Sequence, residues 1–258
     1  MKLQLLSDLH LESEDHDPQP APGAELLVLG GDIDATWAGY ERFANWPVPV
    51  LVVAGNHEFD GRDLVEAWPA FRDLCERLGL TLLECGTALL RDAAGDAIRF
   101  LGTVRWCDFG AFGESGRERA ERAGGYFQHV MRARRSGQVF DVAAVRDEAL
   151  VCRRWLEAEL AVPPRGRWSR TVVVTHFAPS LASADPRYGL QPGTASFCNA
   201  DDDLIPRADT WLHGHLHCRH DYLVERAAKR PTRVVCQARG LVTRGEDVGW
   251  EPLRLIDV

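Results

Sequence analysis

The sequence lacks any long hydrophobic stretch. None of its apolar runs approaches the ~20 residues that a membrane-spanning helix needs. The first residues carry a single lysine and no extended apolar region, so they do not resemble a secretory signal. We therefore expect a soluble, cytoplasmic protein that does not enter a membrane.

The chain also lacks the basic surplus that proteins use to bind nucleic acid or anionic membranes, since its formal net charge is -8. Long nucleic acid is therefore not an expected partner, although a dinucleotide or a cyclic nucleotide would still fit. Bound metal ions can reverse the charge locally, so an acidic surface and an anion-binding pocket can coexist. Nothing in the composition indicates an oligomeric state.

The cysteines lack an organised pattern. There are seven, an odd number, and no two have the spacing of a C-x-x-C zinc or redox motif. Free thiols in a reducing compartment are the interpretation we adopt.

Internal repeats and low-complexity segments are absent as well, so we treat residues 1–258 as one domain. Apolar residues at helical spacing predict helices over 68–78 and 141–160, with Asp141 capping the second. Short runs rich in Val and Leu, bounded by Gly, Pro, Asp or Asn, are typical of strands buried on both faces. Strands that alternate with helices indicate a layered α/β fold. The predicted strands span 3–6, 26–29, 48–54, 171–175 and 210–212, followed by weaker ones at 234–238 and 252–256.

Each of the first five runs is followed by polar residues that bind metal ions. Ligands of open α/β sheets bind beyond the carboxyl ends of the strands, so we expect these residues to converge. Residues two apart in an extended segment point to the same face, which pairs Asp8 with His10 and His213 with His215. Gly214 permits a close backbone approach between the last two. The candidate ligands are Asp8, His10, Asp32, Asn56, His176, His213 and His215.

The chemical types of these ligands indicate transition metals. Imidazole and carboxylate together favour Mn, Fe, Zn or Ni over Ca or Mg. Seven ligands are too many for one tetrahedral zinc ion. Two ions that share one carboxylate would each have about four protein ligands and room for water. We therefore expect two divalent or mixed-valence ions of Mn, Fe or Zn.

These blocks, in this order, resemble the calcineurin-like metallophosphoesterase superfamily. The resemblance rests on Asp8-x-His10, Gly31-Asp32, Gly55-Asn56-His57-Glu58, His176 and Gly214-His215-x-His217, which together span most of the chain. It implies a four-layer α-β-β-α sandwich, in which two mixed β-sheets pack together and helices flank them.

The resemblance also implies a role for each residue. We align His213 and His215 with the two ligands of the last block, which leaves His217 outside the coordination sphere, supporting a ligand or facing the substrate. His57 would be the acid beside the metals, and Asp32 would bridge them. One metal would be held by Asp8, His10, Asp32 and His215, and the other by Asp32, Asn56, His176 and His213.

Such a centre implies hydrolysis of phosphate esters. Two ions about 3.5–4 Å apart clamp the attacking and leaving oxygens and activate a water molecule to hydroxide. His57 would stabilise the developing charge or protonate the leaving group. The expected substrate is a small phosphodiester, nucleotides included. The alternatives are a phosphomonoesterase, including a protein phosphatase, and a non-catalytic metal-binding scaffold on the same fold.

Departures from the family pattern argue against two groups within the superfamily. Protein phosphatases have an Arg shortly after the position of Asp32, and this sequence has none there. Lipid A-pathway diphosphate hydrolases have Arg at the position of His57. Cyclic-nucleotide phosphodiesterases and broad bacterial phosphodiesterases are compatible with both positions. Residues 102–109, 176–180 and 235–240 resemble segments of a group of small bacterial members.

An arginine-rich segment at 110–140 allows two interpretations. It is either a mobile lid that presents Arg to phosphate or a solvated loop with a short helix. Trp106 and Asp108 either line the pocket or belong to the core, and Asp185 and Arg187 are equally ambiguous. Surface positions or satisfied core positions are expected for the other histidines, His16, His129 and His220.

Overall fold

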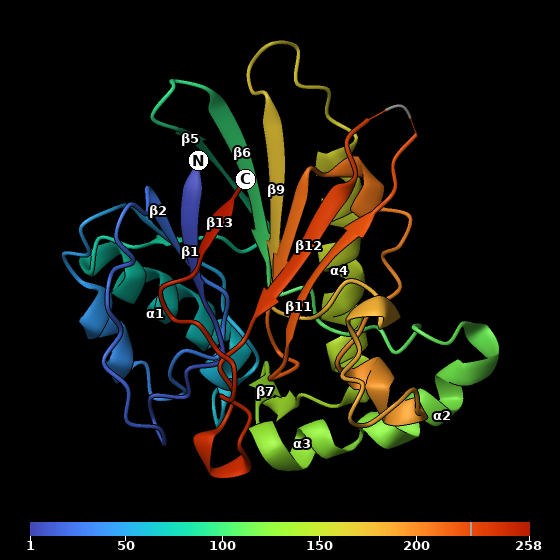
Figure 1. Cartoon of the computed structure of the whole chain (residues 1–258). Helices are drawn as coiled ribbons and strands as arrows, with labels where there is room; N and C mark the ends of the chain where they lie inside the picture. The colour runs from blue at the N-terminus through green and yellow to red at the C-terminus, as the bar shows by residue number, and fades with distance from the viewer. Residues whose placement is uncertain (228) are drawn as a thin grey trace.

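Two β-sheets lie face to face at the centre of the molecule, and helices cover their outer sides (Figure 1). The structure is a computed structural model that describes residues 1–227 and 229–258, with every side chain in these ranges except those of Tyr126 and Phe127. Both large sheets are mixed, which confirms the predicted α/β sandwich of two mixed sheets flanked by helices.

The first sheet has five strands, four of them mutually parallel and the edge strand β13 antiparallel to its neighbour. Its central strands consist almost entirely of Leu and Val and are buried on both faces, as continuous apolar runs predict. In spatial order the strands are β13 (Leu255–Asp257), β1 (Lys2–Leu6), β2 (Leu26–Leu29), β3 (Val50–Val52) and β4 (Thr81–Leu82).

The second sheet has six strands, with antiparallel strands at its two edges and parallel pairing between them. In spatial order they are β11 (Arg219–Val224), β12 (Thr232–Gln237), β10 (Thr210–His213), β9 (Arg170–Thr175), β6 (Ala97–Thr103) and β5 (Gly86–Arg91). All seven predicted strands are therefore present, within a few residues of the expected bounds.

The inner faces of the sheets form one apolar core. Leu5 and Val28 of the first sheet belong to the same buried cluster as Phe100, Val174 and Leu212 of the second. None of these side chains is more than 1 % exposed, so the two sheets are held together by burial of apolar surface.

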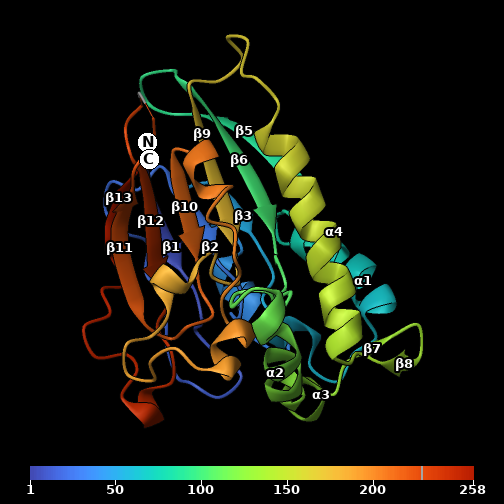
Figure 2. The ribbon, with the colours of Figure 1, turned by 90° about the vertical axis from the view of Figure 1, so that its right-hand side faces the viewer.

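One long helix covers each outer face. Helix α1 (Leu64–Arg77) packs Phe71 against the first sheet, and α4 (Val142–Leu160) packs Leu156 against the second. Figure 2 shows α4 running along the outer side of the second sheet. Both predicted helices are confirmed, although α1 begins before residue 68 because the carboxylate of Asp63 caps it by accepting a hydrogen bond from the Val65 amide.

Shorter elements gather at the end of the sheets toward which β6 and β9 run, at the bottom of Figure 1. They include α2 (Glu114–Gly124), α3 (Tyr126–Met131) and the hairpin of β7 (Arg134–Arg135) and β8 (Gln138–Val139). Short 3-10 helices span Ala38–Phe43, His57–Phe59, Leu181–Ser183, Pro192–Ser196, Ile205–Arg207 and Val242–Arg244. In the described ranges, no helix combines the length and the apolar character that crossing a bilayer requires.

Strand β6 was not among the predicted strands, although all of its residues are buried. Arg99 interrupts its apolar run, which hides the strand in the sequence. The Arg99 guanidinium forms an ion pair with Glu159 of α4 and lies 4.7 Å from the centre of the Trp168 ring. A buried strand can therefore hold an arginine whose charge is paired at the rim of the sheet.

Candidate metal centre

The carboxyl ends of five strands meet at one end of the two sheets. Asp8, Asp32 and Asn56 follow β1, β2 and β3 of the first sheet, whereas His176 and His215 follow β9 and β10 of the second. The centre therefore lies across the seam between the sheets.

A cavity of about 650 Å³ opens over these strand ends. Asp8 and His176 lie beside it and are fully buried. The potential metal-binding side chains that line the cavity are His10, Asp32, Asn56, His57, His215 and His217.

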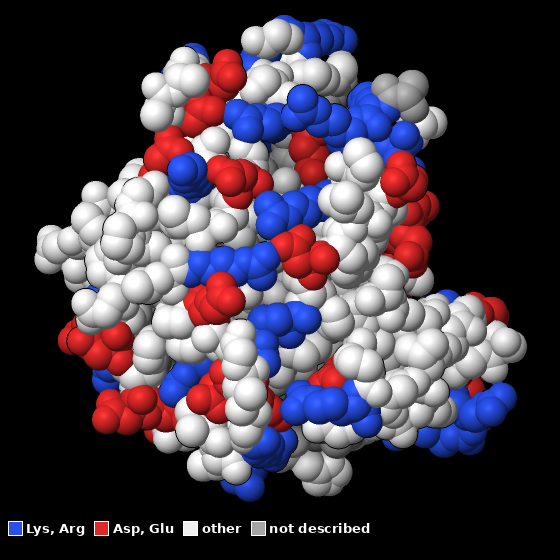
Figure 3. All heavy atoms as spheres, viewed as in Figure 1, with Lys and Arg blue, Asp and Glu red and all other residues white. Residues whose placement is uncertain are grey.

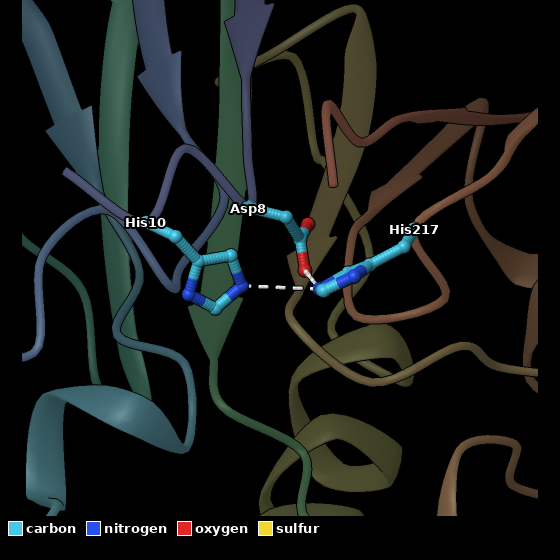
Figure 4. Close-up of side chains that lie close together, drawn as sticks. All are labelled: Asp8, His10 and His217. Atoms are coloured by element: carbon cyan, nitrogen blue, oxygen red, sulfur yellow. Dashed lines mark hydrogen bonds and ion pairs between the residues drawn. The ribbon is translucent and has the colours of Figure 1, made fainter. Parts of the chain in front are cut away.

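Two groups of three side chains in this region have their ligand atoms within 4.8 Å of one another. Figure 4 shows the first group, in which Asp8, His10 and His217 point toward one another. The Nε2 atom of His217 lies 3.1 Å from Nε2 of His10 and 3.4 Å from Oδ1 of Asp8. In the second group, Asp32, His176 and His215, the Nε2 atom of His176 lies 3.1 Å from Oδ2 of Asp32.

The backbone at these side chains is unusual. Asp8, His10, Asp32, His215 and His217 all have positive φ angles, between 48° and 69°. Residues other than glycine adopt this left-handed region rarely, at a cost of order 1–3 kcal/mol each. Strain that recurs at five converging side chains is typical of a functional site whose surroundings hold it in place.

Two glycines make room for the carboxylates. A Cβ atom added at Gly55 would lie 2.2 Å from Oδ1 of Asp32, and one added at Gly214 would lie 2.6 Å from Oδ2 of Asp8. Any larger residue at either position would push a carboxylate out of its group.

The carboxylate of Glu58 ties the loops after β2 and β3 together. It accepts hydrogen bonds from the amides of Asp32 at 3.0 Å, Ile33 at 2.8 Å and Gly55 at 2.6 Å, and from the Tyr40 hydroxyl at 2.9 Å. Because these donors satisfy the buried carboxylate without a cation, Glu58 fixes the positions of Asp32 and Asn56 rather than facing the cavity.

Three imidazoles are oriented through their Nδ1 atoms. The partner of His10 is Glu12 at 3.0 Å, that of His217 is Glu246 at 2.6 Å, and that of His176 is the carbonyl of Gly30 at 2.8 Å. Occupying Nδ1 in this way leaves Nε2 of each ring free to face a metal ion.

The two aspartates create a strongly negative site. Burial alone would raise the pKa of Asp8, but the hydrogen bond from His217 and the charge of His176 lower it to about 2. Burial opposes protonation of His217, yet its hydrogen bonds to carboxylates raise its pKa to about 10. Burial lowers the pKa of His215 to about 3, so this imidazole is neutral and can act as a ligand.

The residues present fit a pair of transition metal ions. Oδ1 of Asn56 is buried and, among the described residues, has no hydrogen-bond partner, and Nε2 of His176 has only the Asp32 carboxylate, at 3.1 Å, beside it. A buried polar atom without a partner is costly unless an ion or a water molecule satisfies it. Both atoms are of the type that borderline metals such as Mn, Fe and Zn accept.

The expected pair His213 and His215 is not the pair that the structure brings to the site. His213 is fully buried, with Nε2 at 3.0 Å from Oγ of Ser183, and belongs to neither group. Strand β10 ends at His213 and the backbone turns there, so the rule for extended segments does not apply across Gly214. The structure instead places His217 beside Asp8 and His10, whereas we had expected it outside the coordination sphere.

The neighbouring residues that were ambiguous in the sequence separate clearly. Trp106 is 1 % exposed and packs against Phe140 and Phe177, so it belongs to the core. Asp108 forms an ion pair with the buried Arg105 at 3.1 Å. Asp185, by contrast, lines the cavity and binds Arg187.

The segment 110–140 reaches the cavity through Val130 alone among the described lining residues. Three of its six arginines form ion pairs elsewhere: Arg117 with Glu114, Arg122 with Glu118, and Arg135 with Glu148. Presentation of these arginines to a phosphate would require the segment to move.

Other residues of the site escaped the sequence analysis. Asp60 binds Nδ1 of His57 at 2.7 Å, and Glu246 and Glu12 orient ligand histidines. Asp60 and Glu12 lie within three residues of their partners, a spacing from which the sequence could have predicted them. Glu246 comes from an irregular loop far along the chain, and only the tertiary fold reveals it.

Comparisons with known proteins identify the family of this chain. The family model for calcineurin-like phosphoesterases matches residues 3–219. A solved phosphopantetheinyl hydrolase from Mycobacterium tuberculosis is similar in fold, with a TM-score of 0.74 at 16% identity, over 99% of this chain and 95% of that one. A dimetal phosphatase from Danio rerio gives a TM-score of 0.47 at 12% identity, over 91% of this chain and 86% of that one. No curated protein matches the sequence. The chain belongs to the calcineurin-like phosphoesterase family and is a metal-dependent phosphoesterase.

Proposed function

We propose that the centre holds two transition metal ions bridged by Asp32. The first ion takes Asp8, His10 and His217, and the second takes Asn56, His176 and His215, so His217 replaces His213 in the expected set. The observation that carries this assignment is the presence of two three-residue groups at the same strand ends, together with the buried Asn56 oxygen, which is left without a partner among the described residues. When bound, two such ions supply Lewis-acid stabilisation and lower the pKa of water.

We further propose that the substrate is a small phosphodiester. Arg244 is the only Arg or Lys among the described residues that line the cavity. A single cation suits the single negative charge of a diester better than the two charges of a monoester. The cavity of about 650 Å³ also leaves room for organic groups on both ester oxygens, beside apolar walls that include Tyr188, Phe197 and Leu241.

In this proposal His57 hands a proton to the leaving oxygen. Its ring lines the cavity, with its centre 5.2 Å from that of His10. Because Nδ1 is bound to Asp60 at 2.7 Å, the other ring nitrogen is available to the substrate.

The preferred ester tests the proposal directly. The metal-free protein, restored with Mn²⁺, should cleave bis-p-nitrophenyl phosphate faster than p-nitrophenyl phosphate, and chelator should abolish both activities. A higher kcat/KM for the monoester would replace the diester proposal with a phosphomonoesterase. If a protein that retains two ions cleaves neither ester, the non-catalytic scaffold is favoured. A phosphopantetheinyl compound, the group named for the similar mycobacterial structure, belongs in the substrate panel.

A further inference from the structure

Another group of potential metal ligands lies outside the cavity, where the loop between β4 and β5 meets helix α4. Glu84 and Cys85 come from the loop between β4 and β5, and Cys152 comes from α4. Their ligand atoms all lie within 4.8 Å of one another. Oε1 of Glu84 is 3.7 Å from each of the two Sγ atoms and 3.0 Å from Oγ1 of Thr103. None of these residues lines the cavity over the metal centre.

The spacing of these atoms matches the edges of a metal-binding tetrahedron. Zinc binds thiolate at about 2.3 Å and carboxylate at about 2.0–2.2 Å. A tetrahedron with those bond lengths has sulfur–oxygen edges of about 3.5 Å, close to the 3.7 Å between Oε1 of Glu84 and each sulfur. Oγ1 of Thr103 lies 3.8 Å from Sγ of Cys85 and borders the cluster.

From this geometry we propose that Glu84, Cys85 and Cys152 bind a thiophilic divalent cation such as Zn²⁺. Two thiolates select zinc-like ions over Mn²⁺, Mg²⁺ and Ca²⁺, which prefer oxygen ligands. Binding exchanges the carboxyl proton and the two thiol protons for the ion, and these protons pass to solvent. The site goes beyond the proposed phosphodiesterase activity, because it shares no ligand with the dinuclear centre.

The carboxylate and one thiol are held in place by the backbone. Oε2 of Glu84 accepts a hydrogen bond from the amide of Val104 at 2.9 Å, which directs Oε1 toward the sulfurs. Cys85 has a φ of 44°, in the left-handed region that residues other than glycine adopt rarely. Cys152 is 2 % exposed, whereas Glu84 and Cys85 are partly exposed, so an ion can enter from their side.

Burial raises the pKa of Glu84 well above its ordinary range, and the contact with Cys85 does the same for the Cys152 thiol.

The site is connected to the dinuclear centre through one residue. The amide of Val104 binds Glu84, and its carbonyl accepts hydrogen bonds from the amides of His176 at 3.2 Å and Phe177 at 3.3 Å. An ion that immobilises Glu84 therefore stabilises the backbone that carries His176.

Titration of the metal-free, reduced protein with Co²⁺ tests the proposal. Cobalt bound to thiolate gives an intense near-ultraviolet charge-transfer band, whereas the ligands proposed for the dinuclear centre include no cysteine. The wild-type protein should develop this band with one equivalent of Co²⁺ beyond the two of the dinuclear centre. Cys152→Ala should lose both the band and that equivalent. Cys75→Ala is the matched control, since Cys75 is also buried on a long helix, α1, and it should retain both.

Cys85→Ser, in a partly exposed loop, repeats the test at a position where loss of folding is less of a concern, with circular dichroism as the check on folding. Absence of the thiolate band in the reduced wild-type protein would overturn the proposal, and so would its persistence in both variants. Thiol counts before and after reduction, with peptide mapping of the oxidised protein, identify a Cys85–Cys152 disulfide. If that disulfide forms and the cobalt band is absent, the two cysteines are a redox pair and the metal-site proposal is wrong.

Discussion

Each catalytic group of the cavity depends on a neighbour that fixes its orientation. His57 is the clearest case, because Asp60 holds Nδ1 while the ring edge faces the cavity. The side chain of His57 is 26% exposed, so it can reach a substrate without any rearrangement of the core. This geometry agrees with the proposed role of His57, in which it acts on the substrate and does not hold the ions.

Replacement of His57 separates these two roles. His57→Ala should retain two Mn²⁺ ions per chain but slow diester hydrolysis by roughly 10²–10⁴-fold, the usual contribution of a general acid. Steady-state kinetics and metal analysis on the same preparation give both quantities. His129→Ala, at an exposed histidine on α3, is the control and should leave the rate unchanged. A His57→Ala enzyme with the wild-type rate would remove this residue from the mechanism.

At the residue scale, the sequence predicts most of the side chains that converge at the centre, but it does not predict His217, which the proposal makes the last ligand. The candidates Asp8, His10, Asp32, Asn56 and His176 follow strands whose apolar runs are unmistakable, so topology alone brings them together. The final motif offers three histidines at spacing two, and the choice among them depends on where β10 ends. That end is set by the turn at Gly214 and by the hydrogen bond of His213 to Ser183, which are tertiary features.

At the scale of elements, the sheets position the centre and the helices stabilise the sheets. The strands that the sequence predicts most clearly are uninterrupted apolar runs buried on both faces, such as β2. The edge strands β5 and β11 alternate between partly buried and exposed residues and carry charged or polar side chains, so their sequences resemble loops. Only the tertiary structure shows that they pair with β6 and β12.

The cap of helix α4 provides a test at this scale. Asp141 accepts a hydrogen bond from the amide of Ala144 at 2.9 Å. Asp141→Ala should lower the free energy of unfolding by about 1 kcal/mol, which in a chain of this size lowers Tm by roughly 2–4 °C. Differential scanning calorimetry measures the shift, and diester hydrolysis at 25 °C should not change. Glu157→Ala, at an exposed position of the same helix, should alter stability by less than about 0.5 kcal/mol. Equal shifts for the two variants would show that the cap contributes nothing.

At the scale of the whole molecule, charged groups lie on the surface and also in the centre. On the face shown in Figure 3, basic side chains gather in a band across the upper part, and elsewhere basic and acidic side chains are interspersed. Two buried aspartates and several histidines meet where the sheets join. The proposed cations would therefore link the two sheets and should stabilise the whole fold.

Metal removal makes this link measurable. Ions present at about 100 times their Kd stabilise the native state by about 2.7 kcal/mol per site, so chelation should lower Tm by roughly 5–10 °C for each site lost. Thermal unfolding before chelation, after it, and after addition of Mn²⁺ should show a loss that is then recovered. Ca²⁺ should restore little, because imidazole ligands disfavour it. A Tm that does not respond to chelation would mean that the ions do not bridge the sheets.

Manganese stoichiometry tests the central claim most directly. The metal-free protein is restored with Mn²⁺, freed of excess by gel filtration and analysed by mass spectrometry alongside the matched variants His217→Gln and His213→Gln. Two ions per wild-type chain are expected, with one fewer in His217→Gln and both retained in His213→Gln. Fewer than two ions in the wild-type protein would contradict a dinuclear centre. Loss of an ion from His213→Gln, with both retained in His217→Gln, would contradict the ligand set that the structure supports.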